Sequence, residues 1–83
     1  MLNPEQLARL RCPESRQTLK YADAQVVAKL NESISAGTLR NRVDHVVDRP
    51  LDAGLVREDG TILYPVIDQI PILIVDEAIL LKA

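Results

Sequence analysis

The sequence predicts an α+β fold: a small, mainly antiparallel sheet of three to five short strands, with a short N-terminal helix and one inserted helix. Two observations carry this prediction. The stretch Thr61–Val75 contains two apolar, β-branched runs around the polar pair Asp68-Gln69, a pattern typical of a β-hairpin. Before it, the chain reads as helix, strand and helix, followed by short strands with tight turns.

The first helix is predicted from its start. Asn3 can cap the helix, and Gln6 stands where a capping box places Glu or Gln. Leu2 and Leu7 are spaced as a hydrophobic staple across that cap. We expect the helix to end near Arg11, shortly before a proline.

The middle of the chain alternates between predicted elements. The range Thr18–Tyr21 alternates polar and apolar residues and predicts a strand. Residues 23–37 carry apolar side chains at helical spacing between an acidic cap and a glycine, which predicts a helix. We expect strands at Val43–Asp48 and Leu55–Arg57, and a tight turn at residues 58–61 because Asp-Gly pairs favour hairpins.

The hairpin itself holds two prolines. Pro65 and Pro71 cannot donate to a strand ladder, so we expect them at strand starts, bulges or outward-facing edge positions. The apolar runs on either side of Asp68 and Gln69 leave little length for a wide loop. We therefore predict a tight turn with at least one residue at positive φ.

Composition narrows the function classes. The 83 residues form one domain, and the single cysteine, Cys12, excludes an internal disulfide and favours a reducing compartment. Without Phe or Trp, the chain lacks the stacking platforms that usually bind single-stranded nucleic acid. Net charge is −2, divided into +3 over residues 1–42 and −5 over residues 43–83. No signal pattern or membrane-length apolar run occurs, so we expect a cytoplasmic protein.

Few residues suggest chemistry. A Cys-Pro-x-Cys knuckle with a second cysteine pair would predict structural zinc, but here Ser15 replaces the second thiol of the knuckle that Cys12 begins. A nucleophilic Cys12 with His45 as its base lacks any supporting spacing. We therefore predict no catalytic residues, no metal and no cofactor, and interpret Cys12 as a small buried residue at a helix end.

Two segments together resemble a known family. Leu10–Ser15 matches L-x-C-P-x-[CS], and Tyr64–Leu73 matches Y-P-[VI]-x-D-x-I-P-[IV]-L, with Asp-Glu-Ala at residues 76–78. This pattern is similar to the small zinc-ribbon proteins of the Trm-one-twelve type. Its eukaryotic and archaeal members are activator subunits of class I, S-adenosylmethionine-dependent methyltransferases that act on tRNA, rRNA and translation factors.

The resemblance includes departures. The family's second cysteine pair would fall at about Arg57 and Gly60, and neither is a cysteine, which implies a bacterial member that has lost its zinc ligands. Gln69 stands where the family usually has glycine. Residues 22–54 correspond to a helical insert between the two matching halves of one domain, residues 1–83.

The resemblance implies a non-catalytic interaction module with a class I methyltransferase as partner. The expected route is an exposed strand edge or apolar patch that pairs with the partner's sheet. The candidate partner-binding residues are Tyr64, Pro65, Ile70, Pro71, Ile72 and Ile74. One alternative is a metal-free structural protein, alone or as a homodimer through the same edge. A nucleic-acid-binding ribbon using the N-terminal arginines is disfavoured by the acidic balance.

Overall fold

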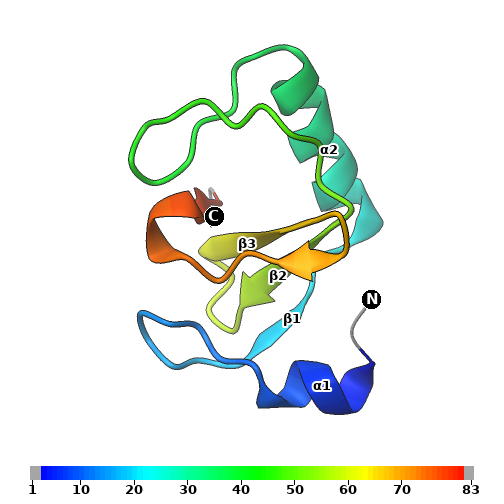
Figure 1. The fold of residues 1–83 in the computed structure, drawn as a ribbon, viewed down its shortest axis with the longest axis vertical. Coiled ribbons are helices and arrows are strands. Elements are labelled where there is room, and N and C mark those ends of the chain that lie inside the picture. The colour runs from blue at the N-terminus through cyan, green and yellow to red at the C-terminus, as the bar shows by residue number, and fades with distance from the viewer. Residues whose placement is uncertain (1–2, 82–83) are drawn as a thin grey trace.

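The computed structural model describes residues 3–81 and shows the predicted α+β architecture (Figure 1). Two helices and a curled antiparallel sheet alternate with turns along the chain. In chain order the elements are α1 (Pro4–Arg9), β1 (Leu19–Tyr21), α2 (Ala24–Ser35), β2 (Ala53–Arg57), β3 (Ile62–Ile67), β4 (Ile70–Pro71), the 3-10 helix η1 (Val75–Glu77) and β5 (Ile79–Leu80).

The sheet is built around β3. Strands β1, β2, β3 and β4 neighbour one another in that order, and every pairing is antiparallel. The two-residue strand β5 also pairs with β3, along Ile62 and Leu63, whereas β4 pairs with Val66 and Ile67. One edge of β3 is therefore shared by two short strands, and the chain leaves the sheet between them.

Both faces of the sheet are covered, and each has its own apolar core. Ile62, Tyr64 and Val66 of β3 belong to a cluster that α1 and the following loop cover. Leu63 and Ile67 belong to a second cluster, against which the apolar face of α2 packs. Figure 1 shows the two helices on opposite sides of the strands. Burial on both faces explains why the strands read as continuous apolar runs.

Both helices have the predicted starts. The Asn3 side chain accepts from the Gln6 backbone N–H, and the Gln6 side chain accepts from that of Asn3, so the capping box is confirmed. The staple through Leu2 lies outside the described residues. Helix α1 ends at Arg9, two residues before the position we predicted, with Leu10 already extended. Helix α2 begins after Asp23, whose side chain makes no capping hydrogen bond.

We predicted a tight turn between β3 and β4 with at least one residue at positive φ, and both of its central residues have positive φ. Asp68 has φ +51° and Gln69 has φ +64°, so both central residues lie in the left-handed region. Two such residues between paired strands form the mirror-image turn that matches strand twist. The Gln69 N–H donates to the Asp52 carboxylate at 2.7 Å, which joins this turn to the segment before β2.

The prediction of a strand at Val43–Asp48 was wrong. This range lies in the loop between α2 and β2, where the isolated bridge Arg40–Val46 replaces a ladder. Asp44 takes φ +66°, and Val43 and Val46 are exposed. The apolar residues of this range predicted a half-buried strand, but the segment pairs with no strand of the sheet and bridges only to Arg40 of its own loop.

The placement of Pro65 also differs from the prediction. Pro65 lies inside β3, opposite Gly54 of β2, and is buried. The Ile72 N–H donates to the Pro65 carbonyl oxygen at 2.8 Å, and proline has no N–H to return that bond. Pro65 therefore lies between the β4 and β5 pairings, where β3 accepts one hydrogen bond from Ile72 and donates none. Pro71 lies in the edge strand β4, as predicted.

Neither helix within residues 3–81 has the length and apolar character needed to cross a membrane.

Candidate functional site

The six candidate partner-binding residues differ in exposure. Ile70 is 60% exposed and Ile74 is 54% exposed, whereas Pro71 and Ile72 are half-buried. Tyr64 has no exposed surface and belongs to the core on the α1 side, so it cannot itself contact a partner. Tyr64 is therefore not part of a partner-binding surface. Its side chain points to the α1-side face of β3, opposite to that of Pro65, and is covered there by the core.

Four apolar residues around the turn project from the same face of the sheet: Pro65, Ile67, Ile70 and Ile72. Ile67 lies opposite Ile70 in the β3–β4 ladder, and the hydrogen bond between Ile72 and Pro65 continues the same register. Directly opposite residues of an antiparallel pair share a face. Ile70 and Ile72 thus extend the α2-side face of β3 toward solvent, and Ile70 forms its outermost part.

The backbone at this edge offers few hydrogen-bond donors. Pro65 and Ile72 form a hydrogen-bonded position, so Pro71, one residue earlier, lies at the alternate position whose backbone faces away from β3. A partner strand aligned with β4 would find no N–H there. Contact through side chains is therefore favoured over strand addition.

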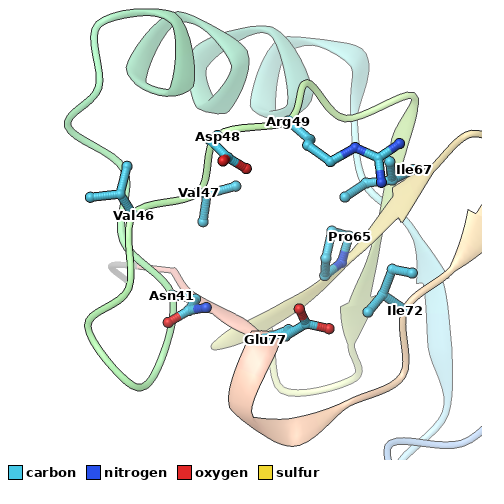
Figure 2. A pocket seen from close by; sticks show the side chains of 9 residues that line it. All are labelled: Asn41, Val46, Val47, Asp48, Arg49, Pro65, Ile67, Ile72 and Glu77. Carbon is cyan, nitrogen blue, oxygen red and sulfur yellow. The ribbon is translucent and has the colours of Figure 1, made fainter.

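A pocket with a volume of about 180 Å³ opens next to this face (Figure 2). Three segments form it: the loop before β2, the α2-side face of β3, and the chain between β4 and β5. Its walls are mainly apolar, and the apolar residues that line it are Val46, Val47, Pro65, Ile67 and Ile72. Because Ile72 and Ile67 belong to both, the pocket and the exposed face around Ile70 form one continuous surface.

The polar residues around the pocket are Asn41, Asp48, Arg49 and Glu77. Figure 2 shows the carboxylates of Asp48 and Glu77 directed into the open space from opposite sides. Within residues 3–81, neither carboxylate forms an ion pair or side-chain hydrogen bond. Arg49 instead pairs with Asp68 at the hairpin turn. Two acidic groups without partners therefore border an apolar pocket.

The loop that forms one side of the pocket is held by hydrogen bonds within itself and to the end of the preceding segment. The Asn41 side-chain oxygen accepts from the N–H groups of Val43 and His45, at 3.1 and 3.0 Å. The Val47 N–H donates to the Leu39 carbonyl oxygen at 2.8 Å. His45 is exposed in this loop. These bonds give the pocket wall a defined shape without regular secondary structure.

A second site centres on Arg57, at the end of β2. Its guanidinium contacts Glu14 at 3.3 Å, Asp59 at 2.9 Å and the Thr61 hydroxyl at 2.8 Å, and its side chain is 12% exposed. The same group lies 3.9 Å from the sulfur of Cys12. Arg57 thus joins the loop after α1 to the β2–β3 turn.

Cys12 is fully buried, as predicted, but it belongs to this polar cluster. Its sulfur lies 3.0 Å from the Tyr64 hydroxyl. Burial alone raises the pKa of the Cys12 thiol, but hydrogen bonds from Ser15 and Tyr64 and from nearby backbone groups outweigh burial and lower the pKa to about 6. Burial, and then the bond to Cys12, raise the pKa of Tyr64. Hydrogen bonds from Arg57, and next from Thr61, hold the pKa of Asp59 well below its usual range.

The Arg57 cluster coincides with the place where the resemblance implies zinc, and its donors do not fit a zinc ion. Cys12 supplies the one sulfur of the cluster, and the guanidinium beside it is already cationic and cannot coordinate a metal. Residues 3–81 contain no group of three or more His, Cys, Asp or Glu side chains arranged to hold a metal. The Arg57 guanidinium itself connects the loop after α1 to the β2–β3 turn.

The N-terminal arginines that would serve a nucleic-acid interface are largely engaged within the chain. Three of them form ion pairs: Arg9 with Glu5 at 3.2 Å, Arg40 with Asp44 at 3.8 Å, and Arg42 with Glu14 at 2.7 Å. Paired side chains have less free charge to offer a phosphate backbone, so this surface supports nucleic-acid binding poorly.

Several pocket residues were missed by the sequence analysis: Asn41, Val46, Val47, Asp48, Arg49, Ile67 and Glu77. The alternation of residues 65, 67, 70 and 72 around a two-residue turn would have placed those four on one face. Nothing in the sequence places the loop or Glu77 beside them.

No protein-family model matches this chain, and no curated protein matches it. Among solved structures, the chain is similar to the solution NMR structure of XF2673 from Xylella fastidiosa, with 26% sequence identity and a TM-score of 0.72. The match covers 95% of this chain and 81% of the Xylella chain. The two proteins therefore share their fold over almost the whole of this chain.

Proposed function

We propose that this protein is a non-catalytic interaction module of the cytoplasm that binds a class I, S-adenosylmethionine-dependent methyltransferase and stabilises or activates it. The observation that carries the proposal is the exposed apolar face at the β3–β4 hairpin, where Ile70 is 60% exposed; a second exposed isoleucine, Ile74 at 54%, follows it before the 3-10 helix η1. The kind of partner comes from the resemblance of segments 10–15 and 64–73 to the Trm-one-twelve type.

The physical basis is the burial of apolar surface. Contiguous exposed apolar groups next to a pocket mark interaction sites more often than scattered ones do. Ile70 continues the pocket wall, so a partner covering it also covers Ile72. Burying a side chain of this size contributes on the order of 1–3 kcal/mol. Because Pro71 leaves the outer edge without a donor, the partner docks through side chains.

Affinity capture from the native cell with mass spectrometry tests the proposal. The bait is the full chain, compared with Ile70→Asp and with Leu80→Asp as a matched control. Ile70 and Leu80 are both 60% exposed, but Leu80 pairs with Ile62 and projects from the opposite face of the sheet. We expect a methyltransferase in captures by wild type and Leu80→Asp, and its loss with Ile70→Asp.

The outcomes separate the alternatives. Capture of only untagged copies of the same chain would replace the proposal with a homodimeric structural protein using the same face. Equal capture by Ile70→Asp and wild type would show that a methyltransferase binds elsewhere. Circular dichroism of both variants must match wild type, since a charged substitution at an exposed position leaves the fold intact.

A further inference from the structure

We propose that the pocket beside Ile72 receives a lysine or arginine side chain from the partner, with the aliphatic stem against the apolar walls and the cationic head between Asp48 and Glu77. This inference rests on the proposed function, because it describes chemistry that the partner must bring to the same surface. It adds a requirement for charge that the exposed isoleucines alone do not impose.

The walls suit the stem of such a side chain. Pro65, Ile67 and Ile72 come from the sheet, and Val46 and Val47 come from the facing loop, so the space is apolar on two sides. Lysine and arginine bury their methylene groups against apolar surface while the charged end stays at a polar rim. A volume of about 180 Å³ accommodates one such side chain rather than a folded element.

The polar rim of the pocket suits the charged end of a lysine or arginine side chain. The carboxylates of Asp48 and Glu77 point into the same space in Figure 2, and no cation within residues 3–81 satisfies either one. Arg49, the positive side chain that also lines the pocket, pairs with Asp68 at the turn. Both carboxylates are exposed at the rim, so a cation arriving between them gains charge-assisted contacts while it keeps part of its hydration.

The same features argue against other occupants. An acidic side chain would meet two carboxylates, and like charges at an interface oppose binding. A purely apolar side chain would cover the carboxylates without satisfying them, which costs their solvation. Two carboxylates on separate segments do not make a metal site, and residues 3–81 hold no third ligand in reach. Charge complementarity therefore selects a cation carried on an apolar stem.

Selection of peptides tests this inference without knowledge of the partner. The full chain is panned against a displayed library of random dodecapeptides, and the most enriched peptide is synthesised. Its affinity is measured for wild type, for the double variant Asp48→Asn/Glu77→Gln, and for Glu58→Gln/Asp76→Asn. The last variant makes the same change in net charge at exposed positions outside the pocket. A second peptide carries norleucine, which keeps the stem and removes the ammonium.

We expect enriched peptides to share a basic residue flanked by apolar ones. Binding should weaken by at least about tenfold with norleucine or with Asp48→Asn/Glu77→Gln, the worth of one or more charge-assisted bonds. Binding by Glu58→Gln/Asp76→Asn should stay within about twofold of wild type. Absence of any enriched basic position, tight binding of the norleucine peptide, or equal loss in both double variants would overturn the inference, as would selection of no peptide.

The two proposals can fail separately. If a methyltransferase is captured equally by wild type and Asp48→Asn/Glu77→Gln, the proposed function stands and the cation pocket does not. If basic peptides bind as expected but no methyltransferase is captured, the pocket chemistry stands and the identity of the partner is wrong.

Discussion

The guanidinium of Arg57 lies 3.9 Å from the sulfur of Cys12, although the two residues are 45 positions apart in the chain. The same guanidinium bonds to Glu14 on one side and to Asp59 and Thr61 on the other. One cation thereby fixes the loop after α1 against the β2–β3 turn. This arrangement, and the turn between β3 and β4, lead to four predictions.

Arg57 should contribute more to stability than any exposed ion pair of the chain. We expect Arg57→Ala to lower the free energy of unfolding by about 1.5–3 kcal/mol, the range for losing hydrogen bonds to charged groups. Arg57→Lys should recover only part of this loss, because an ammonium cannot reproduce the planar fork. Urea denaturation measures both. Arg40→Ala, which removes an exposed pair at 3.8 Å, is the control and should cost much less.

Stability should rise with pH between about pH 6 and pH 9. The pKa of Cys12 is about 6 in the folded protein and 9.0 in its ordinary state, so within this window the folded chain holds a thiolate while the unfolded chain binds a proton. The dependence reaches at most about 1.4 kcal/mol per pH unit. Urea midpoints across this range test it, with the ultraviolet absorbance of the thiolate as a direct reading.

Cys12→Ser is the matched variant for the pH series. It should cost on the order of 1 kcal/mol near neutral pH, more at pH 9, and should remove the slope. Above about pH 10 stability should fall again, because the pKa of Tyr64 is raised in the folded state and the unfolded tyrosine ionises first. Partner binding should survive Cys12→Ser. A wild-type midpoint that is flat from pH 6 to pH 9 would exclude the thiolate.

The protein should fold without metal. The reason is chemical: one thiol and a guanidinium cannot complete the tetrahedral shell of a structural zinc ion. We expect elemental analysis of the purified chain to find less than stoichiometric zinc, and a chelator to leave the melting temperature unchanged. Stoichiometric zinc, or a chelator-dependent melt, would contradict the Arg57 interpretation and the prediction together.

Gln69→Gly should stabilise the β3–β4 hairpin. A non-glycine residue in the left-handed region is held against its preference, and Gln69 has φ +64°. Part of the gain is offset by the added freedom of glycine in the unfolded chain, which leaves roughly 0.5–1 kcal/mol. The resulting Asp-Gly pair is a favoured sequence for this turn. The denaturation midpoint should rise.

Lys29→Gly provides the opposite control for the turn. Lys29 is an exposed residue in the middle of α2, where glycine costs about 1 kcal/mol. If both glycine variants were destabilised alike, the positive φ of Gln69 would not be a source of strain.

The sequence was informative where structure depends on neighbouring residues. The capping box of Asn3 and Gln6, the apolar face of α2 and the turn at Asp68 all follow from spacings of a few residues, and all are confirmed. A pairing between two strands could be predicted only where a short turn connects them directly in the chain. The pairing of β5 with β3 has no such turn and was not predicted.

The two sites were less predictable for the same reason. Arg57 was considered only as a missing cysteine, because two of its four partners, Cys12 and Glu14, lie more than 40 residues away in the sequence. The valines before β2 were predicted to lie in a strand, but Val46 and Val47 instead line the pocket beside Pro65 and Ile67 of β3. A local pattern cannot report which edge is free.

The lack of a backbone donor at Pro71 has a further consequence for the segment Ile70–Val75. Apart from Pro71 its residues are Ile, Leu and Val, and an apolar segment of this kind that begins in an edge strand can template amyloid-like stacking between chains. Pro71 interrupts the row of outward-facing N–H groups on which such growth depends. It therefore acts as a gatekeeper, which leaves Ile70 exposed while opposing the addition of strands from other copies of the chain.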